Sequence, residues 1–106
     1  MMITPGSTIA GQRVIETLGL VRGNTIRARH VGKDIVAALK NLVGGEIQEY
    51  TRMMAQSREQ ALDRMVTEAQ ELGADAVLDV RFTTSYVMGG AAEILATGNA
   101  VRLEAE

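Results

Sequence analysis

The fold of this chain is decided by the stretch ELGADAVLDVRF, residues 71–82, where a helical pattern gives way to a strand pattern. Upstream of it, apolar residues recur at helical spacing on one side of the chain and charged residues fill the other side. The apolar stripe comprises Tyr50, Met54, Ala61, Leu62, Met65, Val66, Ala69 and Leu72. The pattern predicts a helix from Tyr50 to Leu72 that ends at Gly73, because glycine accepts the left-handed conformation of a helix C-cap.

A strand is predicted directly after this turn, over residues 76–82, because apolar and polar side chains alternate there. The pair Gly89-Gly90 suits a two-residue hairpin turn, since both central positions of such a turn can take positive φ. A second strand then follows over residues 91–104. The resulting register places Phe82 opposite Thr97, Val80 opposite Asn99 and Leu78 opposite Val101.

This register decides which face of the sheet meets the helix, because a slip of one residue exchanges the two faces. The face predicted to meet the helix carries Leu78, Val80, Phe82, Leu95, Val101 and Leu103. The opposite face is predicted to stay uncovered, and it holds Val77, Asp79, Arg81, Ile94, Ala96, Gly98 and Ala100.

The first half of the chain predicts a lead-in, a strand and a shorter helix. Residues 1–12 are predicted to be irregular. Residues 13–29 are rich in Val, Ile, Thr and Leu, which favours a strand, with bends or bulges at Gly19 and Gly23. Helical spacing of apolar residues returns over residues 33–43 and predicts a helix of about three turns.

The predicted order is β-α-α-β-β, in a single α+β domain over residues 13–106 that follows the lead-in of residues 1–12. The helices would cover one face of a three-stranded sheet, giving a two-layer domain. Such a sheet leaves its edges and one partly apolar face open, and open edges tend to pair with another chain. We therefore expect a homo-oligomer that closes its sheets into a ring. The alternative is a monomer whose second face is only weakly apolar.

The composition excludes several classes of partner. Eleven basic and 13 acidic residues leave a net charge of −2, which argues against nucleic acid, because neutralising phosphates requires a clustered basic excess. The chain has no cysteine, so disulfides and thiolate metal sites are absent. No apolar run approaches the length of a membrane-spanning helix, and the first residues do not resemble a signal peptide. We expect a cytoplasmic protein that does not bind membranes.

The six methionines and the single histidine give little support for a metal site. Met53 and Met54 point about 100° apart on a helix, and Met54 and Met65 lie about 16 Å apart along its axis. Their interpretation as core-filling residues is favoured. His30 alone cannot build a zinc site within one subunit. We expect no cofactor, no metal ligands and no catalytic residues within one chain.

Asp79 and Arg81 are the weak candidates for a binding site. They are two residues apart on one predicted strand, so they should share a face about 7 Å apart. They could bind a small polar ligand or line the lumen of a ring. They could equally form cross-strand or intersubunit salt bridges, which is the structural interpretation.

A set of short motifs in this order resembles the YbjQ-like family, which carries a heavy-metal-binding label. The motifs lie between residues 30 and 101: Lys33-Asp34, Leu42-Val43-Gly44-Gly45, Glu49-Tyr50, Arg58, Leu72-Gly73-Ala74-Asp75-Ala76-Val77 and Gly98-Asn99-Ala100-Val101. The resemblance implies a β-α-β-β fold akin to a dodecin subunit, assembly as a pentamer and no established reaction. It carries over no ligand residues and assigns no flavin.

These observations lead to three hypotheses. The first is a cytoplasmic homo-oligomeric ring, a pentamer, that acts as a binding or scaffold protein without enzymatic activity. The second is a heavy-metal-binding protein whose ligands are shared between subunits. The third is an enzyme that uses Asp79, Arg81 or His30 at a subunit boundary.

Overall fold

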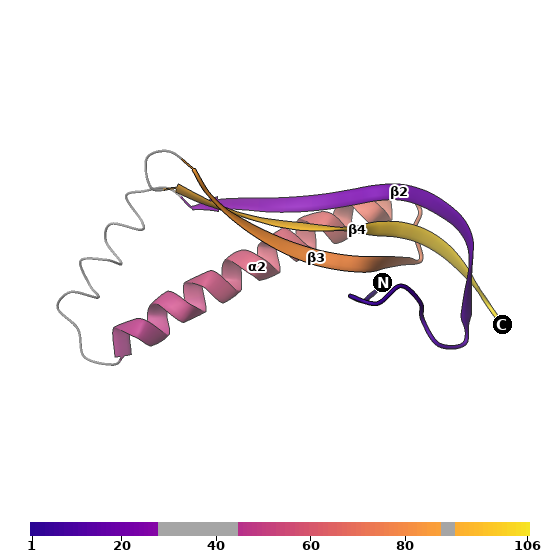
Figure 1. Cartoon of the computed structure of the whole chain (residues 1–106), viewed down its shortest axis with the longest axis horizontal. Coiled ribbons are helices and arrows are strands. Elements are labelled where there is room, and N and C mark those ends of the chain that lie inside the picture. The colour runs from indigo at the N-terminus through magenta and orange to yellow at the C-terminus, as the bar shows by residue number, and fades with distance from the viewer. Residues whose placement is uncertain (28–44, 88–90) are drawn as a thin grey trace.

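The structure, a computed structural model, describes residues 1–27, 45–87 and 91–106, and within them one helix packs against a four-stranded mixed sheet (Figure 1). The strands are β1 (Met2–Ile3), β2 (Gln12–Arg27), β3 (Ala76–Val87) and β4 (Ala91–Ala105), and the helix is α2 (Gly45–Glu71). The strand order is β1-β3-β4-β2. β1 runs parallel to β3, and the two other pairs are antiparallel. The α+β class is confirmed.

The predicted three-stranded sheet has a fourth strand, because the lead-in is not irregular throughout. Met2 and Ile3 pair with Ala76 and Val77 at the outer edge of β3. Two residues are too short to show an alternating pattern, so sequence alone gives no strand signal there. The predicted helix over residues 33–43 and His30 lie outside the described residues.

Helix α2 ends where the sequence predicts and begins earlier, at Gly45. Gly73 adopts a φ of 81°. Its N–H donates to the Gln70 carbonyl at 3.0 Å, and the Ala74 N–H donates to the Ala69 carbonyl at 3.1 Å. This pair of bonds is a Schellman motif, which satisfies the last carbonyls of the helix and directs the chain into β3.

Of the two positions predicted to interrupt β2, Gly19 lies at a register shift, whereas the pairing with β4 is regular through Gly23. The pairing of β2 with β4 shifts register between Thr17 and Gly19, where Gly19 takes a φ of 125°. Figure 1 shows the resulting bend of the long strand. Gly23 lies where α2 crosses β2, and a Cβ there would overlap the backbone of Ala61 and Met65. Glycine at this position therefore permits the close packing of helix on sheet.

The predicted hairpin register is wrong by one residue at the turn. Phe82 pairs with Ala96 rather than Thr97, and Val87 pairs with Ala91. The connection therefore spans residues 88–90, one more than a Gly89-Gly90 turn, and these residues lie outside the described part of the chain. A three-residue loop competes with the two-residue loop in hairpins, and Gly-Gly alone does not distinguish them.

A bulge in β3 adds a second register shift. Leu78 pairs with Asn99 rather than the predicted Val101, and the regular register resumes only at Arg81. Asp79 takes a φ of 54° within this bulge. Because of the extra residue, Val77 and Val80 both enter the core beneath the helix, although their spacing would place them on opposite faces of a regular strand.

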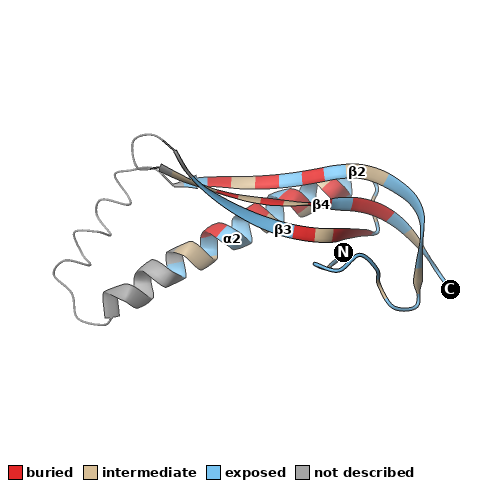
Figure 2. Ribbon diagram, viewed as in Figure 1, coloured by how far each residue is buried: buried red, intermediate tan, exposed pale blue. Residues whose placement is uncertain are grey.

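On β4 the core uses the face predicted to be uncovered, whereas on β3 it includes Val80, which was predicted to face the helix. Figure 2 shows the buried segments of both strands. The cluster beneath the helix consists of Val21, Ala61, Met65, Ala69, Val77, Val80, Ile94, Ala96 and Ala100. Met65 is fully buried in it and Met54 packs against it, so these two methionines do fill the core. A second cluster consists of Ala76, Leu78 and Val101, with Ile9 and Leu103 packed against it. Phe82, predicted to be core, is 44 % exposed.

Candidate functional site

Asp79 sits at the bulge of β3 and joins three segments of the chain. The Ser7 hydroxyl donates to its Oδ1 at 2.7 Å, and the Asn99 side-chain amide donates to its Oδ2 at 3.2 Å. Its own N–H donates to the Gly6 carbonyl at 3.0 Å. A non-glycine residue with positive φ is uncommon, and Asp and Asn tolerate this conformation better than most residues. The carboxylate thus fixes the bulge to the chain's N-terminal residues.

Arg81 is directed to the same N-terminal segment. Its guanidinium donates to the Pro5 carbonyl at 2.9 Å and to the Val80 carbonyl at 3.0 Å. The two candidate residues predicted from sequence therefore have the same structural role. Each binds part of residues 5–7 at the edge of β3. Both side chains thus have partners within the chain. That they bind a small polar ligand stays a prediction.

We call residues 1–9 the N-terminal strap. Beyond the β1 pairing, the Thr4 N–H donates to the Val77 carbonyl at 3.0 Å, and the Val80 N–H donates to the Thr4 carbonyl at 3.1 Å. At its end, Ile9 packs on the second core cluster. Sequence reasoning missed these contacts because they join residues more than 70 positions apart.

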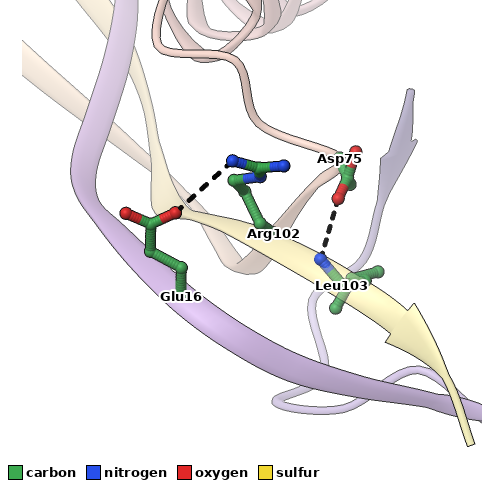
Figure 3. A network of polar contacts seen from close by, with 4 residues as sticks. All are labelled: Glu16, Asp75, Arg102 and Leu103. Carbon is green, nitrogen blue, oxygen red and sulfur yellow. Dashed lines mark hydrogen bonds and ion pairs between the residues drawn. The ribbon is translucent and has the colours of Figure 1, made fainter.

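Figure 3 shows two polar contacts, one that joins the start of β3 to β4 and one that joins β4 to β2. Asp75 follows the helix turn, and its Oδ2 accepts a bond from the Leu103 N–H at 2.8 Å. The neighbouring Arg102 lies 3.7 Å from the Glu16 carboxylate on β2. Both ends of that ion pair are about half exposed, so it adds little stability. These contacts stabilise the fold and do not indicate a binding or catalytic site.

A hollow of about 530 Å³ lies beside β2. It is lined by Arg22, Gly23, Asn24, Glu68, Glu93 and Leu95. The Asn24 side-chain amide donates to a Glu93 carboxylate oxygen at 2.9 Å, and the Arg64 guanidinium donates to the Asn24 carbonyl. The hollow thus combines carboxylates and a guanidinium at the edge strand of the sheet. Sequence reasoning did not predict it, because its residues come from three elements.

No group of three or more His, Cys, Asp or Glu side chains able to hold a metal occurs within residues 1–27, 45–87 and 91–106. A site usually requires at least three protein ligands. No helix in this same part of the chain is long and apolar enough to cross a membrane.

Comparisons with known proteins identify relatives that match nearly the whole chain. The model of the YbjQ family, described as "putative heavy-metal-binding", matches residues 1–104. A UPF0145 protein of Archaeoglobus fulgidus is 61 % identical over 97 % of this chain and 95 % of its own length. A UPF0145 protein of Halorubrum lacusprofundi is 58 % identical over 97 % of this chain and 99 % of its own.

The fold is similar to that of a solved structure. It is the crystal structure of a protein of unknown function from Pediococcus pentosaceus, assigned to the DUF74 family, with a TM-score of 0.65 and 17 % identity. The match covers 98 % of both chains. Identity at this level supports the fold alone.

Proposed function

This chain belongs to the YbjQ family, and from that premise we propose that it works as a homo-oligomeric ring, a pentamer, serving as a binding or scaffold protein in the cytoplasm. The family has no established reaction, and its UPF0145 members are named without an activity. The proposal therefore depends on the surface of the folded chain.

The observation that carries the proposal is the open edge of β2. This strand is 16 residues long and lies at one end of the sheet, with β4 as its one neighbour in the described part of the chain. Four apolar side chains on it are 41 to 62 % exposed: Val14, Ile15, Leu20 and Ile26. A long apolar edge strand attracts another strand, and natural monomers cover or charge such edges.

The chain also exposes more surface than a monomer of its size should. Its accessible surface is 6888 Å², whereas a folded chain of 11.4 kDa is expected to expose about 5,800 Å². The excess, about 1,100 Å², exceeds the roughly 800 Å² that each partner buries in a standard interface. The dimensions, 56 × 27 × 18 Å, are those of an elongated plate. An assembly that buries this excess surface would account for both the large accessible surface and the elongated shape.

Light scattering coupled to size-exclusion chromatography tests this proposal, supported by native mass spectrometry. Five chains of 11.4 kDa predict a single species of about 57 kDa. The variant Leu20→Lys places a charge on the exposed edge strand and should shift the species toward smaller masses. Gln56→Lys, an exposed change on α2, is the matched control and should leave the mass unchanged. A monomeric native chain would overturn the proposal.

The family description favours a second function, a heavy-metal site shared between subunits. Glu68 and Glu93 line the hollow beside β2, where a neighbouring subunit would supply the missing ligands. Calorimetric titration of the assembled protein with Cu, Zn, Ni and Cd tests this function, with Glu68→Gln/Glu93→Gln as the ligand-free comparison. Uptake of less than one ion per ring, or uptake unchanged in the double variant, would reject it.

A further inference from the structure

The outer edge of β3 is divided into a covered part and an open part. The strap covers the edge from Ala76 to Val80, through the β1 pairing and the backbone bonds of Thr4 and Gly6. No described strand pairs with the outer edge from Arg81 to Val87. An edge of unpaired N–H and C=O groups is a template for another strand. The strap therefore leaves one defined segment of this edge for a partner.

Phe82 marks this open segment with an exposed aromatic side chain. It pairs with Ala96, a residue of the core beneath α2, so Phe82 lies on the helix side of the sheet. Helix α2 packs chiefly on β2 and β4 and contacts β3 little. Phe82 is consequently left 44 % exposed beside the helix, on the same face. Buried aromatic residues often carry most of the binding energy of an interface.

We propose that a second copy of this chain adds the outer edge of its β2 to the open segment of β3, residues 81–87, and that its α2 then covers Phe82. The two edges belong to opposite ends of the sheet, so the contact is head to tail, and repetition closes a ring or extends without limit. The neighbour's helix lies over its own β2, closest at Gly23. Adding that strand beside β3 brings the helix to the bare face around Phe82.

In this arrangement the strap fixes the position of the partner. β2 is longer than the open segment, so without the strap it could pair at several positions along β3. A weakly specified register leads to slipped pairing and mixed assemblies. With residues 76–80 occupied, the incoming strand stops at Val80. This inference rests on the proposed homo-oligomer and adds the identity of the two contacting edges.

Cysteine cross-linking tests the inference directly, because the native chain has no cysteine. Thr84→Cys labels the open segment, Leu20→Cys labels β2, and each variant is treated with a short bismaleimide alone and after co-assembly with the other. We expect cross-linked dimers only in the mixed assembly, as a head-to-tail contact requires. Cross-links within Thr84→Cys alone or Leu20→Cys alone would indicate like-to-like contacts and overturn the inference, while leaving the oligomer itself intact.

A second measurement separates the roles of the two faces of β3. Phe82→Asp should reduce the assembly to smaller species, whereas Thr83→Asp, the next residue on the opposite face, should leave its mass unchanged. Equal effects of the two substitutions would contradict a role for the helix-side face. If the native chain is itself a monomer, the proposed function and this inference fail together, and that result is distinct from a wrong cross-link.

Discussion

The two halves of β3 differ in what surrounds them, although they belong to one strand. Ala76, Val77 and Leu78 are buried and pair with β4 on one side, and the strap covers residues 76–80 on the other side. Residues 81–85 have the same β4 pairing but are exposed. The bulge at Asp79 separates the two halves. The comparison shows that a short N-terminal segment, rather than strand propensity, divides the strand into a structural half and an open half.

The variant Leu78→Ala should have the largest effect on the free energy of unfolding. Leu78 is 5 % exposed in the covered half, and removing a buried leucine side chain costs about 2–5 kcal/mol. Thr84→Ala in the open half should change the free energy of unfolding by less than about 0.5 kcal/mol. Urea unfolding of both variants measures the difference. Equal destabilisation would show that the two halves do not differ as described.

Removal of the strap, by deleting residues 1–8, should have the next largest effect. The deletion removes backbone and side-chain bonds to β3, each worth about 0.5–1.5 kcal/mol net, and keeps Ile9 over its cluster. We expect a stability loss of about 2–4 kcal/mol and a broad distribution of assembly masses. Light scattering measures the masses, and an unchanged single species would contradict the strap's role in setting the register.

Substitution of Asp79 should separate its backbone conformation from its side-chain bonds. Asp79→Ala loses both side-chain bonds and places an alanine at positive φ, which costs about 1–2 kcal/mol in addition. Asp79→Asn keeps the shape and tolerates the conformation, so its loss should stay below about 1 kcal/mol. Thermal and urea unfolding rank the variants. An Asn variant as unstable as the Ala variant would show that the negative charge is essential.

Ser7→Ala should have the smallest effect. It removes one exposed bond to Asp79, worth about 0.5–1 kcal/mol, while the backbone bonds of the strap remain. Hydrogen exchange of the Val80 amide, which is bonded to Thr4, should accelerate more than that of amides on β4. Uniform acceleration along the sheet would indicate a global rather than a local loss.

Parts of this fold follow from local patterns in the chain. The helix ending at Gly73 was predicted because a sustained 3.6-residue stripe and a C-cap glycine are both local signals. The bend of β2 was predicted from Gly19 for the same reason. The fourth strand was not predicted, and the predicted register of β3 with β4 was wrong. Val77 and Val80 reach the same core only because the chain bulges between them.

The candidate residues show the same division. Asp79 and Arg81 were identified as charged residues on one strand, but their partners lie at Pro5, Ser7 and Asn99. The hollow beside β2 draws on β2, α2 and β4, which no local pattern brings together. A sequence contains no direct signal for such contacts, because each depends on how distant segments pack.

The sequence by itself determined the elements of this protein: the helix ending at Gly73, the strands that follow it and the irregularity of β2 at Gly19. These features depend on backbone preferences and side-chain periods that act within a few residues. Only the tertiary structure decided which sheet face is buried and where β3 is left open. The buried face of β4 follows from the hairpin register, which differs by one residue from the predicted one. The extent of the open edge follows from the strap, whose hydrogen bonds to β3 join residues about 70 positions apart.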